Sequence, residues 1–390
     1  MYNYKTLKFP KGYLIYEEMK YPRNVFYIIT KGKVISYSIN SNSEIYKEIY
    51  GVGYVVGLIN IAANEPYFIT LEVVEDVEAI EMNLETIINL NTNELIEIMY
   101  NYINSAFEVW LSKYYICIVK NKMDLYHKEN IFKISKIYET NGFFDASYKL
   151  YDEYINDIHN DDKTKDKAIK EMSKLSSMPP EVKLDGNILQ YDKNQCIYTE
   201  LKPTNNLYMI KQGKVGIYNV INNNLILRDV YSKNYIFNNH KPISEYTPLL
   251  TSAICLEPSY IKSYENKEFL EMITKDKELR SFYIKIMSFK IANVFSKIKS
   301  LNNLENKTLK LYIIIFSILK METLFSEQKE LQLSHTIDDI KNSYNFLEED
   351  IINASNNIKS IEIVQNKYIR IANINNFFIE YYKYYNSSCK

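Results

Sequence analysis

Residues 11–37, KGYLIYEEMKYPRNVFYIITKGKVISY, are similar in sequence to residues 193–218, KNQCIYTELKPTNNLYMIKQGKVGIY. The first halves align at an offset of 182 residues and the second halves at 181, because one residue is lost between them. The identical pairs are Lys11/Lys193, Ile15/Ile197, Tyr16/Tyr198, Glu18/Glu200, Lys20/Lys202, Pro22/Pro203, Asn24/Asn205, Tyr27/Tyr208, Ile29/Ile210, Gly32/Gly213, Lys33/Lys214, Val34/Val215 and Tyr37/Tyr218. This spacing indicates a duplicated domain, because solenoid repeats recur every few tens of residues.

The composition bounds the class of protein. The chain has 390 residues and a net charge of −1, so no chain-wide charge attracts nucleic acid or membrane. Its four cysteines form no CxxC pair, which is typical of thiols in a reducing compartment. The start of the chain lacks the apolar segment of a signal peptide, and the longest apolar run, residues 311–319, is too short to span a bilayer. We expect a cytoplasmic protein with no membrane contact.

Glycine and proline mark where the chain turns. They concentrate in residues 1–85 and 184–264, and no glycine follows Gly216. In the first copy we expect a buried strand over 25–29, a turn at Lys31–Gly32, a strand over 33–39 and a returning strand over 44–50. Short strands at this spacing predict a small barrel or sandwich.

The remaining segments have helical periodicity. Residues 86–120 and 265–301 predict two long helices, and the apolar stripe of the second fits either core packing or a dimerisation seam. Residues 131–176 predict a helical hairpin around Gly142, and YETNGFFDASYKLYDEY resembles a tetratricopeptide unit. A single unit cannot bury a repeat core alone. We therefore interpret 121–180 as a helical linker that bridges the duplicated domains and contacts protein partners.

The C-terminal segment, residues 302–390, has its own order of elements. A helix begins at Thr308, Thr336 caps another with Asp339 three residues on, and a third runs over 347–358. Residues 361–371 then predict strand, turn and strand. Three helices followed by a hairpin is the order of a winged helix-turn-helix.

The pattern of the first copy resembles a known domain. FPKGYLIYEE, FYIITKGKV and GYVVGLINIAANEPYFIT are similar to the cyclic-nucleotide-binding domain of catabolite-activator and Fnr-type regulators. The resemblance implies an α+β fold with two β-rolls (1–85 and 184–264). Each is followed by a long helix (86–120 and 265–301), with the tetratricopeptide-like linker between them and a winged-helix-like domain (302–390) at the end.

The family binds phosphate with a short cassette: a glycine–glutamate pair, a short helix, then proline–arginine and a threonine. Gly57, Pro66 and Thr70 match it, whereas Leu58 stands at the glutamate position and Tyr67 at the arginine position. Losing such a charged hydrogen bond costs roughly 1.5–3 kcal/mol. The candidate ligand-binding residues implied by the resemblance are Gly57, Leu58, Asn60, Ile61, Tyr67 and Thr70.

Three interpretations of this cassette remain open. In the first, the roll is structural, and its pocket is filled or has a different ligand specificity. In the second, it binds a cyclic nucleotide weakly. In the third, it binds another small ligand, and Tyr67 stacks on a base or donates to a phosphate. The matching region of the second copy, 235–252, has no glycine and no proline–arginine pair, and His240 there suits a turn better than a ligand site. No metal-ligand spacing, P-loop or nucleophile elbow is present, so we expect no enzyme activity. A cyclic nucleotide is the one candidate cofactor that the resemblance implies.

The C-terminal segment departs from a DNA-binding domain in its charge. Residues 302–390 carry 10 basic and 11 acidic side chains, and Glu348, Glu349 and Asp350 begin the expected recognition helix, where they would repel phosphates. The candidate DNA contacts are Asn353, Asn357, Lys359, Lys367 and Arg370.

Two functions follow from these expectations. The first is a ligand-responsive or degenerate transcription regulator of the catabolite-activator type. The alternative is a non-enzymatic scaffold or protein-docking module that has lost nucleotide and DNA binding. Either works as a monomeric pseudo-dimer, in which the two rolls pack within one chain, or as a homodimer.

Overall fold

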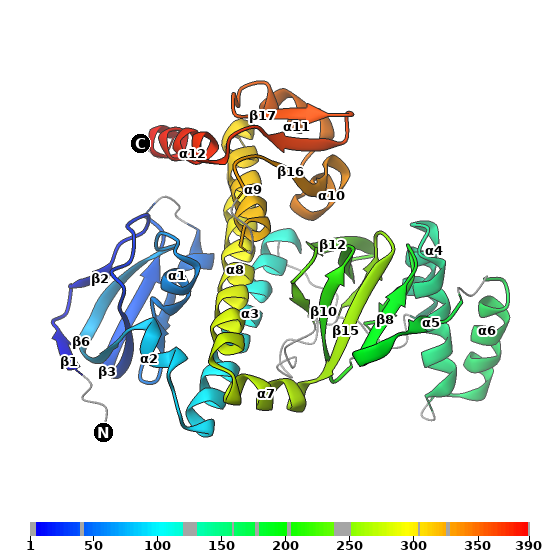
Figure 1. Ribbon diagram of the computed structural model, residues 1–390, viewed down its shortest axis with the longest axis horizontal. Helices are drawn as coiled ribbons and strands as arrows, with labels where there is room; N and C mark the ends of the chain where they lie inside the picture. Colours follow the sequence, from blue (N-terminus) through cyan, green and yellow to red (C-terminus); the bar gives the residue numbers. More distant parts are fainter. Residues whose placement is uncertain are drawn as a thin grey trace. The chain divides into compact units, whose positions relative to one another are not determined.

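The computed structural model describes residues 5–39, 43–119, 131–157, 160–175, 179–200, 204–237, 251–302, 305–324 and 328–388 (Figure 1). The chain divides into two compact units. The first is formed by Met1–Lys113, Leu270–Ser296 and Ser387–Lys390, and the second by Tyr114–Phe269 and Lys297–Asn386. No helix of the described residues is both long and apolar enough to cross a membrane.

The described residues of the first unit form a roll of six strands: β1 (Lys5–Phe9), β2 (Leu14–Tyr16), β3 (Phe26–Tyr37), β4 (Glu48–Tyr50), β5 (Val55–Val56) and β6 (Thr70–Met82). They hydrogen-bond in the order β1-β6-β3-β4, while β2 also pairs with β6 and β5 with β3. Helix α1 (Leu58–Ala63) connects β5 to β6. Alternate residues of the long strands, such as Val34, Leu71 and Val73, face inward and form the core of the roll.

The turn expected at Lys31–Gly32 is not a chain reversal. Strand β3 continues through it, and its register with β6 shifts between Ile29 and Val34. Gly32 has a φ of +84°, and a Cβ there would lie 2.1 Å from the backbone oxygen of Asp76. Glycine is therefore needed for a bulge, which lets both halves of β3 pair with β6. The two-strand prediction was wrong here because a bulge and a turn carry the same glycine signal.

The second roll, in the second unit, has nine shorter strands in two sheets among its described residues. They are β7 (Val182–Lys183), β8 (Ile188–Tyr191), β9 (Cys196–Tyr198), β10 (Asn206–Gln212), β11 (Val215–Ile221), β12 (Asn224–Tyr231), β13 (Ile236–Phe237), β14 (Ser252–Cys255) and β15 (Ser259–Glu265). One sheet has the order β13-β10-β15-β8-β7 and the other β12-β11-β14-β9. Gly213, at a φ of +97°, separates β10 from β11.

The two rolls pair their strands in the same register. Tyr27 lies opposite Val56 in the first roll, and Tyr208 lies opposite Phe237 in the second. Each residue of the second pair therefore follows its counterpart in the first pair by 181 positions. Leu14 pairs with Glu72 and Cys196 with Ile254, which are 182 residues apart. The sequence repeat is thus accompanied by equivalent strand pairing.

Each expected long helix consists of two helices. The first is α2 (Leu84–Ile88) and α3 (Asn93–Val119), and the second is α7 (Asn266–Lys275) and α8 (Lys277–Asn302). The second break lies at Asp276, whose Oδ1 accepts the backbone N–H groups of the first residues of α8. An acceptor at this position starts a new helix rather than continuing the old one.

Within the first unit, α3 packs against α8. The rings of Tyr100 and Tyr283 stack at 5.1 Å, and the Tyr283 hydroxyl donates to Asn104 Oδ1 at 2.7 Å. The Arg280 guanidinium donates to the carbonyls of Ile88 and Leu90, beside the start of α3. The apolar stripe predicted for the second long helix is therefore used, at least in part, for packing inside this unit.

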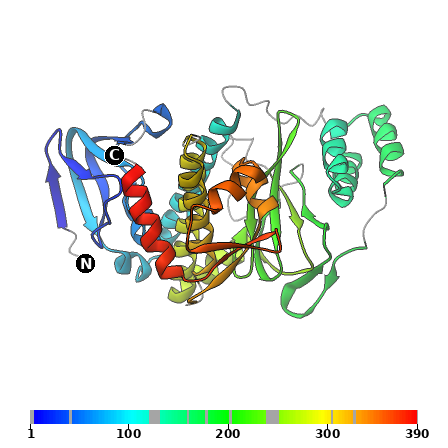
Figure 2. The ribbon, with the colours of Figure 1, turned by 90° about the horizontal axis from the view of Figure 1, so that it is seen from above.

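Three helices pack on the second roll, rather than the two expected. They are α4 (Ile131–Thr140), α5 (Phe144–Asn156) and α6 (Asp162–Met172), and they lie together beside the strands of this roll (Figure 2). Asp161 caps α6 by accepting the N–H of Thr164. Asp145 of α5 accepts the N–H of Cys196 in β9 at 2.7 Å.

The C-terminal segment runs α9 (Lys307–Glu322), β16 (Leu331–Thr336), α10 (Ile337–Tyr344), α11 (Glu348–Ser355), β17 (Ile361–Val364), β18 (Tyr368–Ile371) and α12 (Ile374–Ser388). Its sheet has the order β16-β18-β17. The capping box expected at the start of α10 is present: the Thr336 N–H donates to Asp339 at 2.8 Å and the Asp339 N–H donates to Thr336 at 3.0 Å. Strand β16 and helix α12 were not predicted.

Candidate functional site

The candidate site is the loop and helix between β5 and β6, which corresponds to the phosphate cassette. Gly57 precedes α1 at a φ of +90°, a conformation that side chains disfavour. A Cβ at Gly57 would lie 3.6 Å from the Tyr67 ring, so the structure brings the two ends of the cassette together. Asn64 ends α1, also with positive φ.

The polar residue of the short helix is engaged inside the cassette. Asn60 is buried, and its Nδ2 donates to the carbonyl of Pro66 at 2.8 Å. Leu58 and Ile61 are buried as well, and Leu58 faces an apolar cavity rather than a polar one. These three candidates are therefore buried within the roll, and a ribose hydroxyl would find no acceptor at Leu58.

Tyr67, at the arginine position, is an aromatic packing residue. Its ring stacks on that of Tyr16, with centroids 4.0 Å apart and planes 7° apart. Burial raises the pKa of Tyr67 to about 12, and the exposed Arg23 opposes that rise. Tyr67 is thus neutral at pH 7. The nearby Arg23 is a cation that the motif comparison did not reveal, because it lies outside the cassette.

Thr70 is buried and already bonded. Its Oγ1 accepts the N–H of Glu18 at 3.1 Å. The Glu18 carboxylate in turn accepts the Ser38 hydroxyl and the Ile39 N–H, both at 2.9 Å. The matching threonine therefore fastens the end of β2 to the strand that follows the cassette.

An aromatic cluster covers the cassette next to Tyr67. The ring of Phe68 stacks on that of Phe295 of α8, with centroids 4.8 Å apart. Tyr46 and Trp110 contact the same ring, at 5.7 and 5.0 Å. Phe295 is only 2% exposed. We call these four residues the aromatic plug. Sequence reasoning missed it, because its members are up to 249 positions apart, counted from Tyr46 to Phe295, and share no spacing.

The second roll repeats the Glu18 arrangement at Glu200. Of its matching region, 235–252, residues 238–250 with His240 lie outside the described residues. Glu200 donates its N–H to the Ser252 hydroxyl at 3.1 Å, and its carboxylate accepts the Val220 N–H and the Tyr138 hydroxyl. Ser252 and Val220 are the counterparts of Thr70 and Ile39. Tyr138 of α4 adds a contact that joins the helices to this roll.

Burial raises the pKa of the Glu200 carboxyl to about 8. An unfolded glutamate titrates near about 4.3, so between these values the folded protein holds a proton that the unfolded chain has lost. The free energy of unfolding should therefore fall as pH rises from about 4 to 8, by up to about 1.4 kcal/mol per pH unit. Urea unfolding across this range measures it. Glu200→Gln should flatten the profile, while Glu268→Gln, at an exposed position of the same unit, should leave it unchanged.

The second unit also holds a buried charge cluster that sequence reasoning missed. Asp229 accepts Lys297 Nζ at 2.6 Å and Arg228 Nε at 2.9 Å, and all three side chains are almost fully buried. Burial alone would raise the pKa of Asp229, but the two cations hold it at about 2. The sequence signal for this cluster was the adjacent pair of opposite charges, Arg228 and Asp229, in the otherwise apolar strand NLILRDVY.

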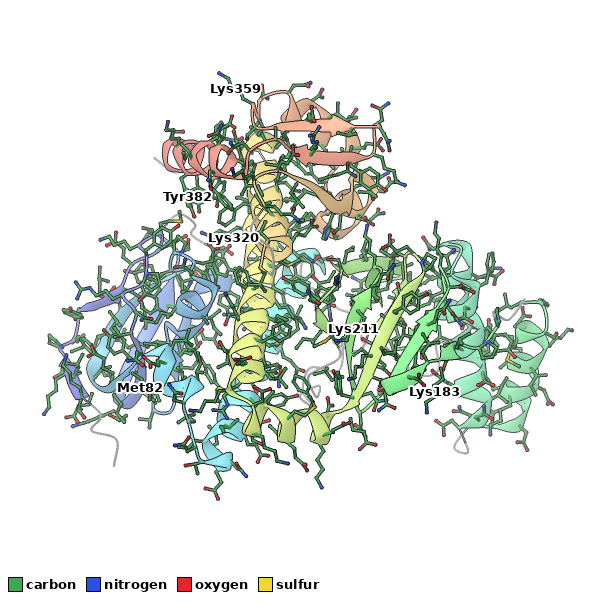
Figure 3. The ribbon with its side chains drawn as sticks, in the orientation of Figure 1. Met82, Lys183, Lys211, Lys320, Lys359 and Tyr382 are labelled. Atoms are coloured by element: carbon green, nitrogen blue, oxygen red, sulfur yellow. The ribbon has the colours of Figure 1, made fainter. Side chains whose placement is uncertain are left out.

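The candidate DNA contacts are not equally available. Asn353, Lys359 and Lys367 are exposed, and Figure 3 shows Lys359 at the edge of the C-terminal segment. Asn357 donates to the Thr308 hydroxyl at 3.2 Å. Arg370 is paired with Glu330 at 2.8 Å and Glu362 at 3.1 Å.

The face of α11 is acidic and apolar. Glu348 and Glu349 are exposed in its first turn, and Leu347 and Ile352 are exposed beside them. The described residues contain no group of three or more His, Cys, Asp or Glu side chains that could hold a metal ion.

The first roll matches a known family of domains. Residues 6–93, less than a quarter of the chain, match the family model of the cyclic nucleotide-binding domain. No curated protein matches the chain. The likeness inferred from the sequence is thus confirmed for these residues.

Similar solved structures include CprK complexed with OCPA (11% identity, 49% of this chain and 87% of that one, TM-score 0.36). A CooA mutant from Carboxydothermus hydrogenoformans is also similar (12% identity, 50% of this chain and 87% of that one, TM-score 0.38). So is FixK2 from Bradyrhizobium japonicum (12% identity, 51% of this chain and 96% of that one, TM-score 0.38). What the comparisons establish for this chain is a cyclic nucleotide-binding domain at residues 6–93.

Proposed function

We propose that this chain is a non-enzymatic regulatory protein built on two cyclic-nucleotide-type rolls, with the first cassette closed by the chain's own side chains instead of by a nucleotide. The observation that carries this is the stacking of Phe295 on Phe68 of the cassette. The aromatic plug occupies the face of the cassette beside Tyr67, which stands where the phosphate-binding arginine is expected.

The hydrogen bonds of the cassette support the same conclusion. Asn60 and Thr70, the polar candidates of the cassette, are both buried and bonded to backbone groups of the roll. A cyclic nucleotide would have to break these bonds and expel a buried ring, with no cation at position 67 to offset the cost. The equivalent Glu18 and Glu200 bonds, together with the shared strand register, support a second roll of the same type.

The first test is calorimetry of the full chain against cyclic mono- and dinucleotides. We expect dissociation constants weaker than about 1 mM, because the charged contact is missing and the cassette is filled. Binding tighter than about 10 µM that is lost in Tyr67→Ala would contradict the proposal.

Phe295→Ala should destabilise the first unit by about 3–5 kcal/mol, because it leaves a cavity among Tyr46, Phe68 and Trp110. Thermal unfolding measures this. Phe144→Ala is the matched control: that ring is 50% exposed, so its removal should cost less than about 1 kcal/mol. Equal losses for the two variants would show that the plug does not stabilise the cassette.

The output of the regulator, on this proposal, is protein contact by the C-terminal segment. The order α9, β16, α10, α11, β17, β18 fits a winged helix. Exposed Glu348 and Glu349 oppose phosphate, whereas exposed Leu347 and Ile352 suit an apolar partner surface. α11 then serves as a docking helix.

A DNA-binding regulator is the second candidate, favoured by the same order of elements. Gel shift with random-sequence and genomic fragments at about 50 mM salt separates the two, because phosphate contacts strengthen as salt falls. The docking proposal expects no shift. A shift that is lost in Lys367→Ala with Lys359→Ala would favour DNA instead, and Lys383→Ala is the exposed control on α12.

A further inference from the structure

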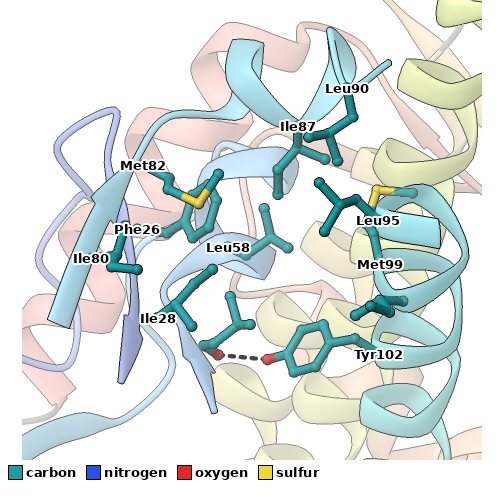
Figure 4. Close-up of a pocket in the computed structure, with 12 residues that line it drawn as sticks. Phe26, Ile28, Leu58, Ile80, Met82, Ile87, Leu90, Leu95, Met99 and Tyr102 are labelled. Atoms are coloured by element: carbon teal, nitrogen blue, oxygen red, sulfur yellow. Dashed lines mark hydrogen bonds between the residues drawn. The ribbon is translucent and has the colours of Figure 1, made fainter. Parts of the chain in front are cut away.

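A cavity of about 240 Å³ lies in the first unit between the roll and helices α2 and α3 (Figure 4). Ile28 and Met82 line it from the strands, Leu58 from α1, and Ile98, Met99 and Tyr102 from α3. Cassette residue Leu58 therefore points toward this cavity. The cavity is a separate feature from the closed cassette.

The wall of the cavity is apolar. Of its lining side chains only Tyr102 carries a polar group, and that hydroxyl donates to the carbonyl of Val55 at 2.5 Å, as Figure 4 shows. An ordered water needs two to four polar partners, so water is a poor occupant here. The lining residues include no charged side chain, so a phosphate or carboxylate would be buried without compensation.

The cavity can exchange its contents with solvent. Leu95 and Ile98 of α3 line it and are 42% and 63% exposed. They form an apolar rim at its mouth. An engineered apolar cavity of about 150 Å³ in another protein stays dry and binds benzene, so this larger space holds a molecule of about six to ten carbon atoms.

We propose that this cavity is a binding site for a neutral, apolar small molecule that contacts the roll and α3 at once. Such a ligand recovers dispersion contacts that the lining atoms otherwise lack. The proposal does not depend on the closure of the cassette, because the two sites share only Leu58 and call for opposite chemistry.

The test uses the full chain with methyl-¹³C methionine and toluene as the probe. Two of its 11 methionines, Met82 and Met99, line the cavity, and Met82→Leu and Met99→Leu assign their signals. We expect toluene to shift these two signals in a saturable manner and to leave that of buried Met287 on α8 unchanged. Benzoate, which has a similar ring with a carboxylate, should shift neither.

A variant at the rim provides the second measurement. Ile98→Trp narrows the mouth at an exposed position, so the fold should survive, and toluene should no longer shift Met82 or Met99. Saturable shifts of equal size with toluene and benzoate, or shifts unchanged in Ile98→Trp, would overturn the proposal. So would Met82 and Met99 signals that depend on protein concentration without toluene, because a second copy of the chain would then fill the cavity.

Discussion

Replacing Asp229 by asparagine is expected to destabilise the second unit by about 3–5 kcal/mol. The substitution keeps the size of the side chain and removes its charge, so Lys297 and Arg228 lose the carboxylate that they share. Both cations are buried, and neither can turn to water without opening the packing between β12 and α8. Urea unfolding of the full chain, followed by circular dichroism, measures the loss.

Two further variants separate charge from packing. Lys297→Met in the Asp229→Asn background removes one uncompensated cation and should recover part of the lost stability. Glu75→Gln breaks the exposed ion pair with Lys33 and should cost less than about 1 kcal/mol. A cost of Asp229→Asn no larger than that of Glu75→Gln would show that the buried cluster is not held together by charge.

The pKa of Asp229 adds a pH dependence with a definite sign. Its folded value of about 2 is below the unfolded value of about 3.9, so the stabilisation is complete above about pH 5. It is lost as pH falls through the folded value. Asp229→Asn should abolish this acid-sensitive part of the unfolding profile. The window is distinct from that of Glu200, which acts between about pH 4 and 8.

The sequence predicted the features that local patterns encode. Gly32 and Gly213 are required in the positions where the repeat preserves them, and Thr336 with Asp339 forms the expected capping box. Glu18 and Glu200 were identical in the repeat, and the structure shows why: each ties the end of one strand to a hairpin.

What the sequence could not predict depends on distant contacts. Phe295 covers Phe68 because α8 packs on α3, and nothing in the spacing of α8 indicates which face meets the cassette. The bond between Lys297 and Asp229 joins residues 68 positions apart. The break at Asp276 was readable from its capping side chain, but a continuous apolar stripe concealed it.

Gly32→Ala and Gly213→Ala should each cost about 2–6 kcal/mol, through backbone strain together with overpacking. At Gly32 the added Cβ would lie 2.1 Å from the backbone oxygen of Asp76. At Gly213 it would lie 2.2 Å from Ser259 Oγ and 2.6 Å from Ser259 Cα. Backbone atoms of a paired strand cannot move aside without breaking the ladder, so the strands must separate at both sites.

Gly12→Ala is the matched control, because Gly12 has a φ of +82° and nothing within 4 Å of an added Cβ. Its cost is the left-handed backbone conformation alone, about 1–2 kcal/mol. The difference between Gly12→Ala and the other two variants therefore measures the close approach of the strands, which thermal or urea unfolding resolves. If all three variants lose the same stability, the repeat preserves its glycines for backbone conformation alone. A larger loss at both Gly32 and Gly213 would show that the duplicated stretch is retained because each roll brings the backbones of two strands together at this point.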